Sequence, residues 1–349
     1  MDGNNSENGG LDAGAQELPA ETLPSSCSVN IRGWENDDEA EARKFGQDVL
    51  SLAREVSRYL DLSRLEGIVI GWDYAEALAS VDQGEGVPPT APTANEYGQG
   101  GAMAMHVVRD DEIWSVVVIW TALVRQLSQT KQPEHQLALQ TFVHELVHVN
   151  DLRLFTRTYP GGWRAAKPRD GRDANLQPIV HPCQSEYSAQ RRAAWAAPEH
   201  GLALLDMLGD AMKDVDGQIR SARVSYRRHG DLDRYWSVVV QRLTFLFQAI
   251  GYGLGHADWV EAKAKEHPEL AARYRAKLAD LAGFPSGWML DACRDAVKPF
   301  FELEQWVDMN IYDPLIEVLE RLLNQNGMYT RAHGDGIYVY MPYTGLHDL

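Results

Sequence analysis

The pentapeptide His144-Glu145-Leu146-Val147-His148 constrains this chain more than any other feature of its sequence. On an α-helix, residues four positions apart lie on the same face, so both imidazoles can bind one metal ion from a single rigid element. The carboxylate of Glu145 would then lie beside that ion, where it can exchange protons with an activated water. The motif therefore predicts a helix with a metal site on one side.

The residues around the motif indicate that its helix is buried. Pro133 and Glu134 suit the first turn of a helix, which we expect to continue to about Phe155. Apolar side chains surround the motif on nearly every side: Leu139, Phe142, Val143, Leu146, Val147 and Val149. Buried histidines and a glutamate need partners, because an unpaired buried polar group costs about 1–3 kcal/mol. A shared metal ion would satisfy them, and the alternative is a pair of hydrogen-bonded core histidines beside a buried carboxylate.

A catalytic zinc site has three protein ligands and one open position for water. The motif supplies His144 and His148, and the best candidate for the third ligand is Glu186, 38 residues after His148. Glu186 stands near the start of residues 185–196, which we expect to form a second helix whose small residues allow close packing. An acid at a helix N-terminus is the ordinary alternative for Glu186. Other possible third ligands are His181, Cys183 and Asp173.

The expected chemistry assigns one Zn²⁺ per chain and gives Glu145 the role of general base and then general acid. Zinc lowers the pKa of water from 15.7 to about 7, which makes a nucleophile available at neutral pH. Asp151, one turn beyond His148, would orient a ligand through a hydrogen bond, or else pair with a nearby arginine at the surface. The candidates for stabilising the oxyanion are Tyr187, His181 and His333.

The motif and a glutamate on a later helix resemble the gluzincin branch of zinc metallopeptidases. The uncharged residues that flank the motif match the preference of that group: Thr141, Phe142, Val143, Leu146, Val147 and Val149. Asn150 departs from the apolar residue usual at its position. The glycine and third histidine that extend the motif in metzincins are absent. The resemblance covers about residues 65–200.

This resemblance implies a zincin-like fold, in which a twisted sheet lies above the motif helix and a second helix carries the third ligand. It also implies that the edge strand of the sheet, either 103–108 or 115–121, pairs with an extended peptide substrate.

The pattern of the whole chain predicts an α+β fold with four segments. Residues 1–35 are polar and rich in glycine, typical of a disordered acidic leader. Residues 36–200 form the expected catalytic domain, with strands near 67–71, 102–108 and 115–121. Residues 201–327 read as successive helices that form a wall of the cleft or a cap. Residues 328–349 end the chain with a β-hairpin and a tail.

Composition excludes several classes of function. The formal net charge of -17 repels phosphates, which argues against nucleic acid or an anionic membrane as partner. A peptide or protein substrate is what the resemblance to metallopeptidases implies. Cys27, Cys183 and Cys293 are too few and too far apart for a disulfide framework. The first 30 residues lack a secretory signal. The most apolar stretch, residues 238–254, is too short and contains too many polar residues for a membrane span. We therefore expect a cytoplasmic protein.

The sequence-based hypothesis is a zinc-dependent hydrolase of peptide bonds. His144, His148 and Glu186 would bind the zinc ion, and Glu145 would be the general base. Two alternatives stay open: a zincin-like interaction module with a structural metal or none, and a metal-dependent amidase for a non-peptide substrate. A structural zinc site would be closed by a fourth ligand, such as His181 or Cys183. The long loop 83–101, rich in glycine and proline, could gate the cleft.

Overall fold

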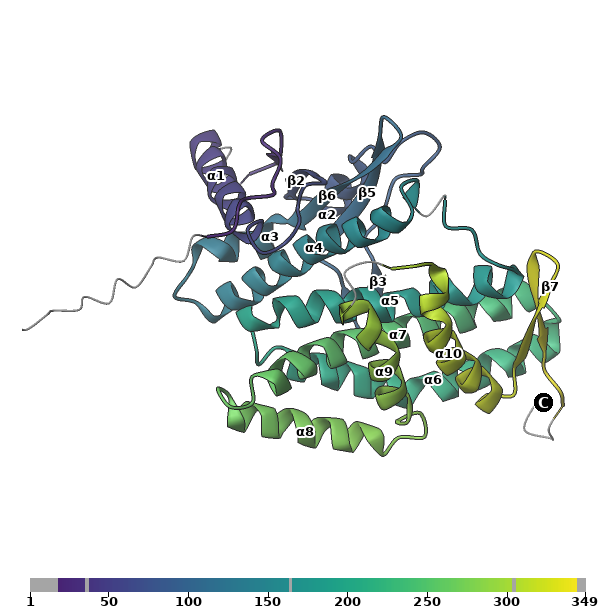
Figure 1. The fold of residues 1–349 in the computed structure, drawn as a ribbon. Coiled ribbons are helices and arrows are strands. Elements are labelled where there is room, and N and C mark those ends of the chain that lie inside the picture. Colours follow the sequence, from purple (N-terminus) through teal and green to yellow (C-terminus); the bar gives the residue numbers. More distant parts are fainter. Residues whose placement is uncertain (1–17, 35–37, 163–164, 303–305, 344–349) are drawn as a thin grey trace, which may run out of the picture.

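The computed structural model describes residues 18–34, 38–162, 165–302 and 306–343. Within these residues the chain has a mixed α+β fold, with a four-stranded sheet in its first half and a long succession of helices after it (Figure 1). The α+β class and the mainly helical C-terminal half, both predicted from the sequence, are confirmed.

The sheet has the strand order β1-β2-β6-β5. Strands β1 (Ser28–Arg32), β2 (Leu65–Gly71) and β6 (Glu112–Trp120) are parallel to one another, whereas β5 (Ala102–Arg109) runs antiparallel to β6 and forms the edge next to it. The valine-rich run of β6 is buried on both faces, as expected for an internal strand with helices on either side. Of the two segments proposed as the edge strand, the structure therefore selects the first.

Helices cover both faces of this sheet. Helix α2 (Tyr74–Ala79) packs on one face of the sheet against Val116 and Val118 of β6. Helices α1 (Glu39–Val56) and α4 (Pro133–Thr158) lie on the opposite face, where they share a core with Val117 and Ile119. The short helix α3 (Thr121–Val124) follows β6 directly. Helix α4 carries the His144–His148 motif and is surrounded by apolar residues, so its burial is confirmed.

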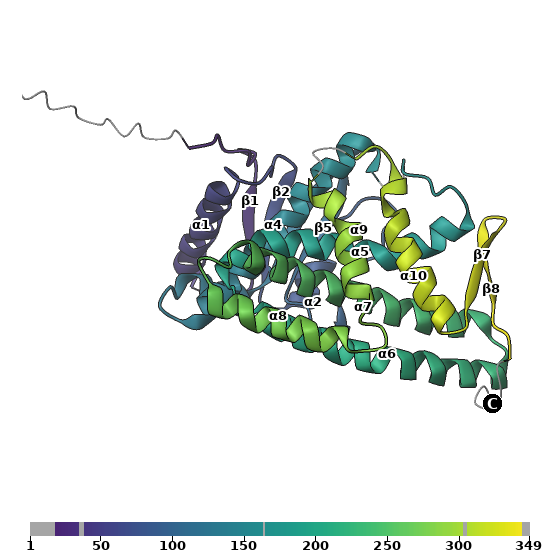
Figure 2. The same ribbon diagram turned by 60° about the horizontal axis from the view of Figure 1, so that its bottom comes forward.

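The second half of the chain is a stack of helices below α4 (Figures 1 and 2). Helix α5 (Gly171–Ala193) lies between α4 and α7 (Leu232–Ala262), and α6 (Gly201–His229) packs on α7. The remaining elements are α8 (Pro268–Ala282), α9 (Met289–Glu302), α10 (Asp313–Gln325) and the hairpin of β7 (Tyr329–His333) and β8 (Gly336–Tyr340). Because α5 contributes side chains to the sheet-side core and to the helical core, it joins the two halves.

Two sequence-based expectations about the ends of elements are wrong. Residues 28–32, assigned to a disordered leader, form strand β1, whose Val29 and Ile31 pack near α1; the first 17 residues of that leader lie outside the described residues. Helix α5 starts at Gly171, although the second helix was expected to begin at residue 185, and it contains Pro178 and Pro182. Asp170 caps its start through the backbone N–H of Asp173, and buried apolar residues outweigh the two lost hydrogen bonds.

A small two-stranded sheet precedes the edge strand β5 in the chain. Strands β3 (Ala94–Asn95) and β4 (Gly98–Gln99) form a small hairpin within the predicted loop 83–101. Among the described residues no helix is long and apolar enough to span a bilayer, including α7, which holds the most apolar stretch of the sequence.

Candidate metal centre

The two histidines of the motif point to the same side of α4, as their spacing predicts. The Nε2 atoms of His144 and His148 lie 3.1 Å apart, and the two rings are nearly perpendicular, at 85°. The His148 Nδ1 lies 3.2 Å from the Ser185 Oγ. A proton on Nδ1 would be donated to this hydroxyl, which leaves the lone pair of His148 Nε2 for a metal ion.

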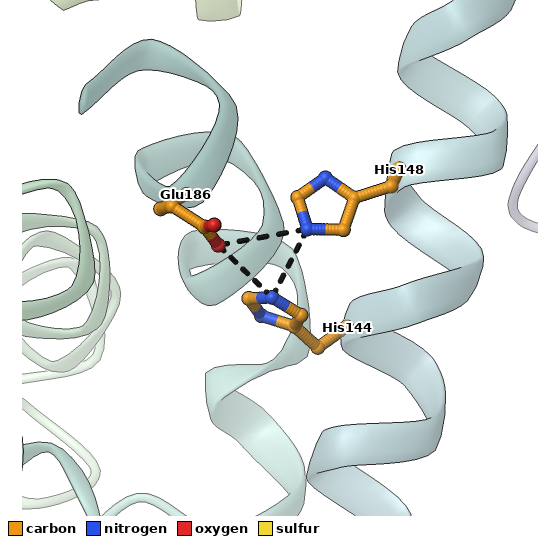
Figure 3. Close-up of side chains that lie close together, drawn as sticks. All are labelled: His144, His148 and Glu186. Atoms are coloured by element: carbon orange, nitrogen blue, oxygen red, sulfur yellow. Dashed lines mark hydrogen bonds and ion pairs between the residues drawn. The ribbon is translucent and has the colours of Figure 1, made fainter. Parts of the chain in front are cut away.

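Helix α5 brings the carboxylate of Glu186 to the same point (Figure 3). Its Oε2 lies 3.1 Å from the Nε2 of His144 and 3.5 Å from the Nε2 of His148. Three ligands bound tetrahedrally at about 2.1 Å from one zinc ion would lie about 3.4 Å from each other. The three observed separations therefore match those around one ion.

The chemistry of these three groups also fits a cation. The ligand atoms of the two imidazoles and the carboxylate lie within 4.8 Å of one another, so each can offer a lone pair to one ion. Burial lowers the pKa of His148, but the hydrogen bond and the charge of Glu186 outweigh it and raise that pKa to about 9. The site thus favours a positive charge at this position, and the group can hold a metal ion. The geometry does not identify the metal.

Glycines on α7 hold that helix close to α5. A Cβ atom on Gly251 would lie 2.5 Å from the Cys183 carbonyl oxygen, and one on Gly255 would lie 2.4 Å from that of Tyr187. The sequence Gly251-Tyr-Gly253-Leu-Gly255 is therefore a close contact between helices, and α7 continues through it without a break. This contact brings side chains of α7 to the metal centre.

Two of these side chains surround Glu186. Gln248 Nε2 donates to the Glu186 Oε1 at 3.0 Å and to the Tyr252 hydroxyl at 2.9 Å. Gln248 thereby leaves the second carboxylate oxygen, Oε2, for the histidines. Burial and the negative charges of Glu186 and Glu145 raise the pKa of Tyr252 well above its ordinary value. Its hydroxyl therefore keeps its proton at neutral pH and can act as a hydrogen-bond donor in the site.

A buried polar layer lies one helical turn from the site. Gln140 precedes His144 by one turn, Gln190 follows Glu186, and His256 follows Tyr252 on the three helices. The Gln190 Oε1 accepts a hydrogen bond from the Gln140 Nε2 at 2.7 Å and lies 3.2 Å from the His256 Nδ1. The layer ties α4, α5 and α7 together directly behind the residues that form the metal centre.

Glu145 connects the motif helix to the edge strand. Its Oε2 accepts a hydrogen bond of 2.7 Å from the backbone N–H of Ala104 in β5. The side chain is buried, with 7% of Glu145 exposed, and it faces the same cavity as the two histidines. The carboxylate is thus held beside the metal centre without belonging to the three-residue ligand group, as a proton acceptor would be.

The metal centre opens into a cavity of about 690 Å³. The edge strand β5 and helix α4 line one side of it, and α5, α6 and α7 line the other. Five histidines lie on its walls: His106, His144, His148, His181 and His200. Its volume falls within the range of about 300–1,000 Å³ that is typical of sites for small molecules.

Among the residues proposed to support the metal, Asp151 and His181 line the cavity. The Asp151 Oδ1 accepts a hydrogen bond from Asn150, and its charge contributes to the raised pKa of His148. Burial lowers the pKa of His181 to about 4, so this ring is neutral at pH 7. His181 lies where the sequence expected a stabiliser of the oxyanion, whereas the hydrogen bond of Asp151 goes to Asn150 and not to a proposed ligand, so its orienting role stays a prediction.

Tyr187 does not line the cavity. It follows Glu186 directly, so it points to another side of α5, where its hydroxyl donates to Asp258 at 2.6 Å and accepts from Arg191 at 2.7 Å. His333 lies on β7, outside the cavity lining. The structure therefore brings neither residue to the metal centre.

The alternative third ligands lie elsewhere on α5. Cys183 is buried in the helical core beside Cys293, and Asp173 forms an ion pair with Arg169 at the start of the helix. Glu186 lies in the middle of α5, so the macrodipole at a helix N-terminus does not explain it. Within the described residues, one group of three can hold a metal ion, and it consists of His144, His148 and Glu186.

Sequence analysis assigned no role to Tyr252 or Gln248. A signal was present, since glycines four residues apart in a helical region are typical of a close contact between helices, and Tyr252 lies between Gly251 and Gly255. That pattern does not identify which helix is contacted, and only the contact with α5 brings Tyr252 to Glu186.

Comparison of the chain with protein families, with curated proteins and with solved structures found no match. The function of the centre is therefore argued from its residues and their geometry.

Proposed function

We propose that this chain is a zinc-dependent hydrolase of peptide bonds, whose zincin-like catalytic part consists of the sheet, α4 and α5. The observation that carries the proposal is the convergence of His144, His148 and Glu186 beside Glu145, at the wall of a cavity. Two imidazoles and one carboxylate are a ligand set that catalytic zinc uses in peptidases. When bound, zinc would supply a Lewis acid and would acidify a water molecule.

Glu145 carries the proton transfer. Its carboxylate would accept a proton from the attacking water and deliver that proton to the leaving amine, which balances the hydrolysis of one amide bond. The Ala104 N–H, 2.7 Å from the Oε2, holds the carboxylate in place during both steps. This hydrogen bond also fixes the distance between the base and the edge strand.

The edge strand β5 would orient the substrate. Ala104 N–H points to Glu145 and the Val108 N–H points to the Gln83 carbonyl oxygen, so alternate residues of β5 direct their backbone groups away from β6. The backbone of Ala102 and His106 faces the same way. A peptide in extended conformation can pair with these groups, which brings one of its carbonyls to the metal centre.

Tyr252 is the residue that we assign to stabilise the developing oxyanion. Its hydroxyl is protonated, lies beside Glu186 and faces the cavity across from β5. A hydrogen bond from such a donor is made more fully in the transition state than in the ground state, and removing one costs about 10²–10³ in kcat.

Two features argue for catalysis over the structural alternatives. The ligand group has three members among the described residues, whereas a structural zinc site is closed by four. His181 lines the cavity but does not join the group, and Cys183 lies in the core. The position left for a fourth ligand therefore faces the cavity. A non-peptide amide would use the same chemistry, and the choice of substrate in the experiment decides between these two classes.

The test is metal content and peptide hydrolysis for the wild type, Glu145→Gln and Tyr252→Phe, with casein and its tryptic digest as substrates. We expect one zinc per chain in all three proteins. Glu145→Gln should lose about 10²–10⁴-fold in rate and Tyr252→Phe about 10²–10³-fold. Zinc without hydrolysis of any peptide would contradict the peptidase and leave a non-peptide amidase or a structural site. A protein without zinc would contradict the metal centre itself.

A further inference from the structure

A short segment crosses from the edge strand to the helical half of the molecule. This segment, residues 93–100, contains the β3–β4 hairpin and leads directly into β5; we refer to it as the strap. The strap is closed at its base by the Gly100 N–H, which donates to the Thr93 carbonyl oxygen at 2.9 Å. At its tip, the Asn95 side chain accepts a hydrogen bond from the Tyr97 N–H at 2.9 Å. These bonds give the strap a defined shape.

The tip of the strap is attached to helices α6 and α7. The Tyr97 ring stacks on Phe245 of α7, with centroids 4.7 Å apart and planes 6° from parallel. The Tyr97 hydroxyl donates to Asp214 of α6 at 2.9 Å, and Glu96 pairs with Arg242 of α7. Burial and the hydrogen bond to Asp214 raise the pKa of Tyr97 to about 12. Tyr97 and Glu96 thus attach the strap to three side chains of α6 and α7, across the cavity.

The strap lies at one end of the cavity. Ala104 of β5 donates to Glu145 of α4, and His106 and His148, further along the two elements, line the same cavity, so β5 and α4 run in the same direction along it. The strap precedes Ala102 and therefore lies at the end nearer to His144. Six of its residues line the cavity: Thr93, Asn95, Tyr97, Gly98, Gln99 and Gly100.

Aromatic side chains line the opposite end. Phe155 lies eleven residues beyond His144 on α4, and its ring centroid is 6.0 Å from that of Trp306. Between Phe155 and the strap, the volume of about 690 Å³ has room for a few amino-acid residues. A polypeptide that continued along β5 past Ala102 would meet the strap.

We propose that the strap restricts the substrates of this site to short peptides. The inference rests on the proposed function and adds the substrate class: a chain that extends beyond the cavity at the Ala102 end requires the strap to detach from α6 and α7. The site accepts an oligopeptide and excludes the interior of a long polypeptide, even one without folded structure.

The experiment compares intact casein with its own tryptic digest, because the two contain the same sequences and differ in length. The wild type is compared with a strap-release variant, Tyr97→Ala with Arg242→Gln, which removes the stacked ring, the hydrogen bond to Asp214 and the ion pair to Glu96. The matched control is Tyr59→Ala with Arg275→Gln, where the tyrosine is 71% exposed and the arginine pairs with Glu261 at the surface. Zinc content and the melting temperature are measured for all three proteins.

We expect the wild type and the control to hydrolyse the digest at least about tenfold faster than intact casein, per cleavable bond. The strap-release variant should gain about tenfold or more on intact casein and change less than about threefold on the digest. Equal rates of the wild type on both substrates would overturn the proposal, and so would a release variant with an unchanged ratio.

A second readout does not require catalysis and separates this inference from the proposed function. Native mass spectrometry of zinc-loaded Glu145→Gln is expected to show complexes with short peptides of the digest and none with intact casein. Complexes with both, or with neither, would overturn the size restriction. If peptides bind but the wild type does not hydrolyse them, the proposed peptidase fails while the restriction to short peptides holds.

Discussion

Helix α4 and the pair formed by α5 and α7 contribute to one metal centre in different ways. Helix α4 supplies His144, Glu145 and His148 from five consecutive residues, so helix geometry alone aligns them. Helices α5 and α7 supply Glu186 and Tyr252, which are 66 residues apart in the sequence and meet only because the helices touch. One half of the centre is local, and the other half is made by packing.

The two halves of the centre are therefore expected to be sensitive to different kinds of substitution. A substitution on α4 acts on the site through the residue that it removes. On α5 and α7, a substitution outside the site can disrupt it as well, because the glycines of α7 and the contact of Gln190 with His256 determine the separation of these two helices. The four predictions below test this distinction, from the largest effect to the smallest.

Removing a ligand should have the largest effect on either side of the comparison. We expect His148→Ala and Glu186→Gln each to weaken zinc binding by more than about 100-fold, which exceeds the 10–100-fold typical of outer-shell partners. The measurement is zinc affinity by competition with a chelator, and His333→Ala, on β7 outside the cavity lining, is the control with unchanged affinity. If Glu186→Gln binds zinc as tightly as the wild type, the assignment of Glu186 as a ligand supplied by α5 is wrong.

Gly255→Ala tests the contact between α5 and α7 without touching a site residue. Its Cβ would lie 2.4 Å from a backbone oxygen of α5, so the helices must separate. We expect a loss of about 2–3 kcal/mol in the free energy of unfolding, together with weaker zinc binding. Gly217→Ala on α6 is the matched control, because nothing lies within 4 Å of its new Cβ.

The control should gain up to about 1 kcal/mol, since alanine favours a helix. Chemical denaturation measures both variants. Equal stabilities of the two would show that α5 and α7 do not depend on this glycine for their contact.

Gln190→Met tests the polar layer behind the site. The change keeps the volume but leaves the Gln140 Nε2 and the His256 Nδ1 without the oxygen that they contact. Buried polar groups left without a partner should cost about 1–3 kcal/mol in the free energy of unfolding. Gln47→Met, at an exposed position on α1, should change it by less than about 0.5 kcal/mol. Thermal unfolding measures both variants. Equal losses of stability in Gln190→Met and Gln47→Met would contradict the role of the polar layer.

Asp173→Asn should have the smallest effect, at the start of α5. The Arg169 guanidinium lowers the pKa of the Asp173 carboxyl by a hydrogen bond and by its charge. The folded state therefore binds this proton less well than the unfolded state, and the pair stabilises the fold above about pH 4. That contribution, about 1 kcal/mol or less because Arg169 is partly exposed, is lost as the pH falls through the folded-state pKa.

The measurement is the difference in the free energy of unfolding between the wild type and Asp173→Asn from pH 7 to pH 3. It should be largest near pH 7 and shrink toward pH 3. A difference that grows as the pH falls would contradict the sign of this shift.

Local patterns predicted the parts of the fold that depend on neighbours in the sequence. Short apolar runs predicted strands β2, β5 and β6, and the apolar residues around His144 predicted the buried helix α4. Strand β1 was missed because it has few apolar residues, and its pairing with β2 gives it a place in the sheet. Helix α5 was expected to start late because Pro178 and Pro182 oppose a helix locally, while its buried side chains favour one.

The sequence by itself determined that His144 and His148 share one face of a buried helix with Glu145 beside them, because the spacing of residues on a helix is fixed by its backbone. Glu186 was the best of several candidates at that stage, and its distance of 3.1 Å from His144 depends on where α5 lies. Tertiary structure alone decided the contributions of Tyr252, Gln248 and the strap. Contacts between elements far apart in the sequence follow from close packing of the whole chain, which no local pattern specifies.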